Sequence, residues 1–250
     1  MATLSQRHVV IERSQLPDLC VGCDSRAASV CNAIEDRDMA RLAAITTSSE
    51  APVGRVFIQE GESADNFFNI TLGTARLFKL LPDGRRQITG FVGPGHFLGL
   101  AVSDTYAFSA EAMEPVRFCR FSRPRLRVLL DDFPALEKRL LEVAATELVA
   151  AQEQMLLLGR KTAVERLASF LLAQSVMGVP CGHPRAHLTL KMTRGDIADY
   201  LGLTIETISR TLTRLRNERL IDIPSTTDVI IRNHAALVNL AGGLNRSPTA

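Results

Sequence analysis

The stretch TRGDIADYLGLTIETISRTLTRL, residues 193–215, decides the fold of the C-terminal part of the chain. Thr193 can cap a helix, with Asp196 at the capping-box distance, because an N-cap side chain bonds the N–H groups that the first turn leaves free. Gly202 is suited to end that helix in a left-handed conformation, and Thr204 can cap the next helix. The stretch therefore predicts two short helices separated by a tight turn.

Three residues within these helices have the spacing of a helix-turn-helix. Ala198 is small enough for the two helices to approach closely, and Gly202 makes the left-handed turn. Ile208 is apolar and β-branched, so it can lock the second helix onto the first. A corner with a purely structural role does not need all three residues, so the pattern favours DNA binding.

The second helix carries polar residues that could read DNA from its first turns: Glu206, Thr207, Ser209 and Arg210, followed by Arg214. Arg210 can bridge O6 and N7 of guanine, and Glu206 can accept from a cytosine amino group. Ser209 can approach a thymine or a phosphate. For Arg214, a phosphate contact or a solvated position is favoured over a base contact.

The flanking segments predict a winged domain over residues 159–242. The helix KTAVERLASFLLAQSVMG (161–178) and the strand HLTLKM (187–192) precede the two helices. STTD and VIIRN follow them and are expected to form the wing. Residues 243–250 are expected to form a disordered tail.

Composition and charge limit the class of protein. The 250 residues are 46% hydrophobic and 22% charged, as in ordinary globular proteins. Residues 159–250 hold 12 Lys and Arg against 7 Asp and Glu, whereas residues 1–158 hold 17 against 20, so the C-terminal part is suited to a polyanion such as double-stranded DNA. No apolar run reaches the roughly 18 residues of a membrane span, and the N-terminus lacks a secretory signal. We therefore expect a cytoplasmic protein without a membrane partner.

Short runs of β-branched and aromatic residues from about Val53 to Phe121 predict β-strands. PDG at 82–84 lies between RLFKLL and QITGF and predicts a hairpin turn, and GPG at 93–95 predicts another turn. Several strands at this spacing favour an antiparallel sandwich or roll, to which we assign residues 35–131.

One long helix is expected over residues 132–158, because no Gly or Pro interrupts the segment from Ala135 to Leu158. One apolar stripe has the alternating gaps of a coiled-coil seam: Leu141, Ala144, Leu148, Ala151, Met155 and Leu158. A second stripe, with a carboxylate beside it, is assigned to a dimer interface: Val143, Ala150, Glu153 and Leu157. Two apolar faces are explained if one packs on the same chain and the other on a second copy, so we expect a homodimer. A single helix buried in a monomer is the alternative.

Three of the five cysteines lie in CVGCDSRAASVC, residues 20–31. In a reducing compartment such thiols are metal ligands or redox groups more often than disulfides. Cys20, Cys23 and Cys31 leave a site of four thiolates one ligand short. Their spacing alone favours neither an iron–sulfur cluster nor Zn²⁺, and a free-thiol redox switch is a third alternative.

The sequence GLTIETISRTLTRL, preceded by a long helix and a roll with QITGF, resembles the Crp/Fnr transcription regulators from about residue 17 to residue 240. Glu206, Ser209 and Arg210 match the E-x-x-S-R signature of the FNR branch. The resemblance implies an α+β fold with an N-terminal antiparallel β-roll of the cyclic-nucleotide-binding type, a long dimerisation helix and a C-terminal winged helix-turn-helix. It also implies a homodimer on a palindromic TTGAT-type DNA site.

The family resemblance also identifies where a cyclic nucleotide would bind. Cyclic-nucleotide members carry G-E-L and R-S-A motifs, whose Glu and Arg hold the ribose and the cyclic phosphate. In GLAVSDTYAFSAEA, Leu100 stands in place of that Glu and Phe108 in place of that Arg. We therefore expect no cyclic nucleotide as effector.

The resemblance to oxygen-sensing FNR proteins implies a [4Fe-4S] cluster held by three N-terminal cysteines and one from the roll. By that resemblance Cys20, Cys23 and Cys31, within an N-terminal cluster-binding segment (1–34), and Cys119 ligate its iron. Zn²⁺ is the alternative cofactor.

The strand VRFCRF agrees with the fourth ligand, because side chains alternate along a strand. Cys119 should lie on the face opposite Phe118 and Val116, where it can point under the N-terminal segment. Cys181 lies in a loop beside His183 and is left out of the ligand set. A metal site of Cys181 with His183 and His187 is less favoured than a polar loop.

The expected function is an oxygen-responsive transcription regulator, mainly an activator of anaerobic or microaerobic genes. The cluster would order residues 20–31 against the start of the long helix, and Glu153 carboxylates that meet across the dimer axis would repel each other. RNA polymerase is an expected partner, and the 82–86 hairpin is the candidate contact. The alternative is a zinc- or thiol-dependent Crp/Fnr-type regulator that does not sense oxygen through a cluster. An enzyme is not expected, because CVGC has no nearby His base and the roll no catalytic carboxylate pair.

Overall fold

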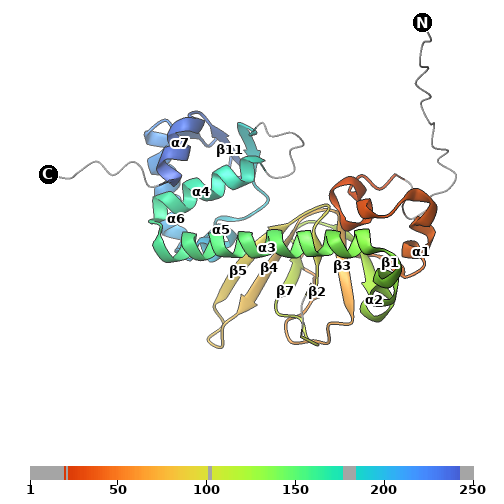
Figure 1. Cartoon of the computed structure of the whole chain (residues 1–250). Coiled ribbons are helices and arrows are strands. Elements are labelled where there is room, and N and C mark those ends of the chain that lie inside the picture. Colours follow the sequence, from red (N-terminus) through yellow and green to blue (C-terminus); the bar gives the residue numbers. More distant parts are fainter. Residues whose placement is uncertain (1–19, 21, 101–102, 177–183, 243–250) are drawn as a thin grey trace, which may run out of the picture.

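The computed structural model describes residues 20, 22–100, 103–176 and 184–242. One long helix, α3 (Pro134–Arg160), runs along a β-roll, and the C-terminal domain lies over its far end (Figure 1). A segment of short turns lies over the near end of the same helix (Figure 1). The expected α+β fold, with a roll, a long helix and a winged helix-turn-helix, is confirmed.

Two four-stranded antiparallel sheets form the roll, in the orders β1-β8-β3-β6 and β2-β7-β4-β5. The strands are β1 (Thr46–Ala51), β2 (Val56–Ile58), β3 (Asn66–Leu72), β4 (Ala75–Leu80), β5 (Arg86–Val92), β6 (Phe97–Leu98), β7 (Ser109–Ala112) and β8 (Val116–Ser122). The β4–β5 hairpin turns through Gly84 (φ 84°), and Gly95 (φ 92°) turns the chain before β6. Both predicted turns are confirmed. Glycine suits these positions because it takes positive φ without strain.

The space between the two sheets holds the core of the roll. The rings of Phe68 on β3 and Phe118 on β8 lie 5.5 Å apart there. The buried members of this core come from both sheets: Ala51, Ile58, Ala64, Phe68, Ile70, Ala75, Val92, Leu98, Tyr106, Ala110, Ala112, Val116 and Phe118. Burial of this apolar surface holds the sheets together.

The outer face of the first sheet is covered by a second apolar cluster. It is built from the N-terminal turns η2 (Arg26–Ala28), η3 (Val30–Ala33) and η4 (Asp36–Asp38), with α1 (Met39–Ala43), α2 (Arg123–Asp132) and the start of α3. Its buried members are Val30, Ile34, Met39, Leu42, Phe97, Phe121, Leu126, Leu129, Leu136 and Leu140. Strands β3, β6 and β8 of the first sheet are thus covered in part on both faces.

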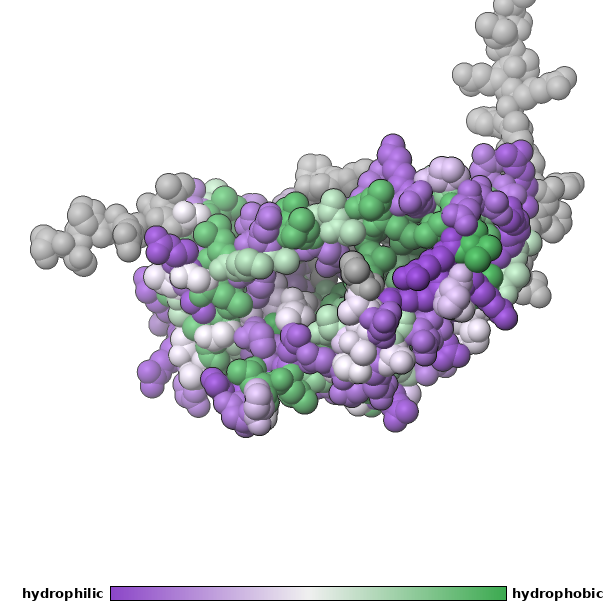
Figure 2. Space-filling view, turned by 60° about the horizontal axis from the view of Figure 1, so that its bottom comes forward, coloured by the Kyte–Doolittle hydropathy of each residue, from purple (hydrophilic) through white to green (hydrophobic). Residues whose placement is uncertain are grey.

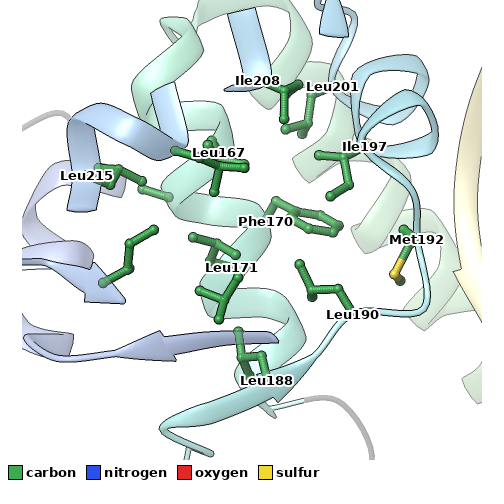
Figure 3. Close-up of a cluster of buried hydrophobic side chains, with 14 of the residues drawn as sticks. Leu167, Phe170, Leu171, Leu188, Leu190, Met192, Ile197, Leu201, Ile208 and Leu215 are labelled. Atoms are coloured by element: carbon green, nitrogen blue, oxygen red, sulfur yellow. The ribbon is translucent and has the colours of Figure 1, made fainter. Parts of the chain in front are cut away.

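The C-terminal domain packs four helices, α4 (Ala163–Val176), α5 (Arg194–Leu201), α6 (Ile205–Asn217) and α7 (His234–Ala241), on a small sheet. That sheet has the order β10-β11-β9, from β9 (His187–Thr189), β10 (Ile221–Asp222) and β11 (Asp228–Ile231). Phe170 lies at the centre of the core, between Leu167 and Leu171 of its own helix and Ile197 of α5 (Figure 3). The predicted wing is confirmed as the β10–β11 pair.

Helix α3 begins at Pro134, two residues later than the expected start at 132, and ends at Arg160, two residues later than the expected end at 158. Gly159 does not stop it, and the chain leaves the helix at Lys161, which has an extended conformation. In the part of the chain that the structure describes, no helix is long and apolar enough to cross a membrane.

Candidate functional site

The helix-turn-helix has the local geometry that its sequence predicts. Thr193 and Asp196 form a complete capping box, with the Asp196 N–H donating to Thr193 Oγ1 over 3.1 Å and the Thr193 N–H donating to Asp196 Oδ2 over 3.0 Å. Gly202 is left-handed, at φ 62° and ψ 42°, and Thr204 Oγ1 accepts from the N–H of Thr207. The positions of α5 and α6 therefore follow from local backbone chemistry.

Arg166 of α4 fixes this pair of helices to the end of α3, a role that sequence reasoning missed. Its guanidinium donates to three carbonyl oxygens, of Leu158 (2.7 Å), Leu201 (2.8 Å) and Lys161 (2.9 Å). These carbonyls lie at or near the C-terminal ends of α3 and α5, where helices leave acceptors without partners and favour a positive charge. A lone Arg in an amphipathic helix carries no sequence signal of such a contact.

Helix α6 exposes the residues predicted to contact DNA. Glu206, Ser209, Arg210 and Arg214 are exposed and Thr207 is half-buried, whereas the opposite face packs in the core through Ile208, Thr211, Leu212 and Leu215. All five predicted residues thus lie on one helix at the surface.

Two of the α6 charges are held by neighbours on the same helix. The pKa of Glu206 is lowered, first by its own backbone N–H, then by the Thr204 hydroxyl and, more weakly, by the charge of Arg210. Arg214 donates to Glu218 over 2.7 Å. Arg214 is therefore already paired with Glu218 when no DNA is bound. This agrees with its assignment to a phosphate rather than a base.

Cys119 lies on the outer face of the first sheet, as predicted. Phe118 and Val116 belong to the core between the sheets, whereas Cys119 packs at the edge of the cluster under the N-terminal segment. Cys20 and Cys31 pack at the edge of the same cluster. The structure thus brings Cys20, Cys31 and Cys119 to the edge of one apolar cluster.

Gly95 allows the N-terminal segment to lie close to the roll. A Cβ atom at this position would lie only 2.8 Å from Cβ of Ala28, which is part of η2. Within the segment, Arg26 donates to the carbonyl of Ile34 and pairs with Asp36. The N–H of Cys31 donates to Ser29 Oγ, which caps η3. The loop between Cys20 and Cys31 is therefore held by internal hydrogen bonds and an ion pair, and it packs closely on the roll.

The four thiols interact electrostatically with one another. The pKa of Cys119 is raised to about 12, mainly by burial and in addition by the charges of Cys31, Cys23 and Cys20. Burial likewise raises the pKa of Cys31 to about 11, while Ser29 and Arg26 oppose the rise. The thiols of Cys31 and Cys119 are therefore protonated near neutral pH in the absence of a positively charged metal centre, whose binding must displace those protons.

The chemistry of this donor set fits an iron–sulfur cluster or zinc, both of which accept four thiolates. All four cysteines are free thiols. Within the described ranges, no three His, Cys, Asp or Glu side chains are placed to hold a metal ion. Cys181 and His183 lie outside the described residues, and His187 is within 3.1 Å of Asp228.

Leu100 and Phe108, which stand where cyclic-nucleotide members carry Glu and Arg, line one cavity of about 250 Å³. Its described lining is largely apolar: Leu77, Phe97, Leu98, Gly99, Leu100, Phe108, Ala144 and Glu147. Leu100 and Phe108 therefore meet at one site, as the alignment of motifs implied. That no cyclic nucleotide binds here stays a prediction.

The apolar stripe of α3 through Leu141, Leu148 and Met155 is exposed, whereas the set assigned to the dimer interface is exposed only in part. Leu141, Leu148 and Met155 are 66%, 60% and 70% exposed. Leu157 is buried in the core of its own chain's C-terminal domain, and Val143 is half-buried against the roll. The assignment of Leu157 to the interface is therefore corrected, whereas Ala150 and Glu153 are exposed. Figure 2 shows hydrophobic residues in an interrupted band along the upper part of the visible face.

The roll and the C-terminal domain are joined by polar contacts that sequence reasoning did not predict. Arg76 of β4 pairs with Asp196 (2.6 Å) and Glu111 (2.7 Å), and Arg86 of β5 pairs with Asp196 (3.1 Å) and Asp199 (2.9 Å). Beside them, rings from the two sides pack together, with Phe91 5.3 Å from Tyr200. Because Arg86 is used in this contact, the 82–86 hairpin offers less free surface to a polymerase than its sequence indicated.

Comparison with known proteins agrees with both domains. Residues 165–240 match the Crp-like helix-turn-helix domain family, and residues 49–133 match the cyclic nucleotide-binding domain family. The chain is similar to the nitrogen fixation regulation protein FixK of Bradyrhizobium diazoefficiens, with 38% identity over 204 residues, which cover 82% of this chain and 86% of FixK.

Two further similarities extend over most of the chain. The transcriptional activator protein FnrL of Cereibacter sphaeroides is 34% identical over 227 residues, which cover 89% of this chain and 92% of FnrL. The solved structure of FixK2 from Bradyrhizobium japonicum matches with a TM-score of 0.73 and 33% identity, and covers 82% of this chain and 100% of that chain. These relatives are regulators of transcription or of nitrogen fixation by name, and none is named as an enzyme.

Proposed function

Because the chain belongs to the Crp/Fnr family of transcription regulators, we propose that it is an oxygen-responsive regulator that carries a [4Fe-4S] cluster on Cys20, Cys23, Cys31 and Cys119. It acts as a dimer on a palindromic TTGAT-type site, mainly as an activator of genes used when oxygen is scarce. The observation that carries the proposal is the position of Cys119 under the segment that bears the other three cysteines.

The four cysteines would hold the cluster, which when bound supplies a redox group whose integrity depends on oxygen. Cys119 contributes a ligand from a rigid strand, whereas the other three come from a segment of short turns. Burial raises the pKa of both Cys20 and Cys31, and the positive charge of Arg26 opposes a small part of that rise. The chain thus supplies both the ligands and part of the charge compensation.

The N-terminal segment is placed to act on the dimer helix. Turn η3 contains Cys31 and packs against α3, where Val30 is buried in the same cluster as Leu136 and Leu140. A change in the order of η3 therefore alters the support of α3 directly. Further along the helix, the exposed stripe at Leu141 and Leu148 is free to meet a second copy.

Recognition helix α6 supports the DNA part of the proposal. Arg210 is exposed in its second turn and can donate two hydrogen bonds to guanine, and Glu206 is ionised and can accept from cytosine. Two such helices in a symmetric dimer read two half-sites related by a two-fold axis.

The experiment that tests the cofactor is metal and sulfide analysis of the full chain purified without oxygen. The proposal expects a brown protein with about four iron and four sulfide per chain, whose visible absorption is lost in air. Cys119→Ser should abolish it, whereas the matched variant Cys181→Ser should retain it. A colourless protein with one zinc per chain would instead establish the zinc-dependent alternative.

A further inference from the structure

The last carbonyl groups of helix α5 accept hydrogen bonds from side chains of three other elements. A helix leaves these acceptors without partners of its own. The Tyr200 carbonyl accepts from Nε2 of Gln154 in α3 over 3.0 Å, and the Asp199 carbonyl accepts from Nε2 of Gln87 in β5 over 2.7 Å. The carbonyl that follows accepts from Arg166 of α4. The first helix of the helix-turn-helix is therefore held at its C-terminal end by the roll, by α3 and by its own domain.

Gln154 lies between two faces of α3 that have different neighbours. Met155, the next residue, belongs to the exposed stripe that is free to meet a second copy. Leu157, three residues further on, is buried in the core of the C-terminal domain. Gln154 itself is half-buried, and its amide donates to the end of α5. One turn of α3 thus carries both a part of the proposed dimer seam and a polar contact to the DNA-reading unit.

The contact of Gln154 can fix an orientation, which apolar packing alone does not. The burial of Leu157 holds the domain on α3 but has no preferred direction, whereas an N–H···O bond weakens steeply when its angle departs from linear. Helices α5 and α6 form one unit, because the turn at Gly202 is fixed and Ile208 is buried in the core that α5 shares. The orientation of α6 relative to α3 therefore depends on how the end of α5 is held.

We propose that Gln154 is a positioning residue that sets the separation and angle of the two recognition helices in the dimer, and with them the spacing of half-sites that the protein accepts. This inference rests on the proposed function, a dimer on a palindromic site. Both half-sites are bound at once only when the two α6 helices are held at the matching separation. A looser hold on α5 lets other spacings fit and lowers the affinity for the correct one.

The test compares Gln154→Met with the unchanged full chain, each loaded with iron and sulfide without oxygen. Methionine keeps the length and the helix propensity of glutamine but has no N–H to donate. Binding is measured to a palindromic TTGAT-type duplex and to the same duplex with one base pair inserted at its centre, which turns one half-site by roughly 35°. The insertion should weaken binding of Gln154→Met about fivefold less than binding of the unchanged chain, the ratio that corresponds to one hydrogen bond of ~1 kcal/mol.

Asn233→Ala separates this role from a general loss of stability. Oδ1 of Asn233 accepts from the N–H of Ala236 and caps α7, a hydrogen bond within the C-terminal domain. Its loss lowers the stability of that domain but should leave the preference for half-site spacing unchanged. Gln154→Met should sediment as a dimer, as the unchanged chain does, because its contact is made within one chain.

Three results would overturn the inference. Gln154→Met could distinguish the two duplexes as strongly as the unchanged chain does, or it could be monomeric, which would assign Gln154 to dimerisation instead. Asn233→Ala could lose the same preference for spacing, which would show that any weakening of the domain suffices. If the unchanged chain binds neither duplex, the proposed function is wrong and this inference fails with it.

Discussion

Nη1 of Arg76 in strand β4 lies 2.6 Å from Oδ1 of Asp196 in helix α5, so one carboxylate both starts the helix-turn-helix and ties it to the roll. The side chain of Asp196 is only 3% exposed, and Arg86 of the neighbouring strand approaches the same carboxylate oxygen. The orientation of the DNA-reading helices relative to the sensor roll therefore depends on a buried charge.

Asp196→Asn should weaken this link while it keeps an oxygen that can cap α5. We expect a loss of about 1–3 kcal/mol in the free energy of unfolding, because buried hydrogen bonds to charged groups are lost. Chemical denaturation measures it. Asp199→Asn, which removes a more exposed partner of Arg86, should cost less than about 1 kcal/mol. Equal stability of Asp196→Asn and the unchanged chain would contradict this role.

The same carboxylate gives the link a defined dependence on pH. Burial raises the pKa of Asp196, but hydrogen bonds from Thr193 and the charges of Arg76 and Arg86 outweigh it, so the pKa is lowered. A lowered pKa in the folded state stabilises the fold above about pH 4, and this contribution is lost as the pH falls through the folded value. The stability difference between Asp196→Asn and the unchanged chain should therefore shrink in acid.

Arg210→Ala should reduce both the affinity and the sequence preference of DNA binding. Loss of a bidentate contact to guanine costs about 1–3 kcal/mol and relaxes specificity at that base pair. Arg214→Ala should have a smaller and more uniform effect, because Arg214 pairs with Glu218. Binding to duplexes with single base-pair changes in each half-site distinguishes the two. Uniform weakening by Arg210→Ala would show that it binds phosphate instead.

Leu148→Asp should prevent dimerisation if the exposed stripe of α3 forms the seam. The side chain is 60% exposed in one chain, and a charge placed there would be buried without a partner in the dimer. Val128→Asp, on α2, changes an equally apolar and exposed residue outside the stripe and should leave the dimer intact. Sedimentation of the loaded protein gives the answer, and a dimer of Leu148→Asp would place the seam elsewhere.

Glu153→Ala should favour the dimer in air. Glu153 is exposed on α3 but lies on a different face from Leu141, Leu148 and Met155. This prediction therefore tests a seam that includes the Glu153 face, where two carboxylates that meet near a two-fold axis would repel each other. The variant should dimerise and bind DNA without its cofactor. A variant that stays monomeric in air would contradict this part of the account.

The parts of the fold that follow from local chemistry were predictable. Thr193, Gly202 and Gly84 each dictate a cap or a turn within a few residues, and the structure has each as expected. Strand alternation placed Cys119 on the correct face. Strand β1 was not expected, because TTSSEA has no apolar alternation and becomes a strand by pairing with β8. Helix α7 and the N-terminal turns were also not predicted.

The parts that depend on distant contacts could not be predicted. Nothing near Arg76 in the sequence indicates that it meets Asp196, and nothing near Gln154 indicates that its amide reaches the end of α5. Leu157 fitted a seven-residue repeat, but the C-terminal domain buries it within its own chain. Periodicity identifies an apolar face and does not identify what covers it.

The most direct test of the central claim is DNA binding by one preparation before and after exposure to air. The full chain is loaded with iron and sulfide without oxygen, and its affinity for a palindromic TTGAT-type duplex is measured together with its visible absorption. The account predicts that both fall together in air, and that Cys119→Ser binds weakly throughout. Unchanged binding by the bleached protein would contradict the claim that these four cysteines control this regulator.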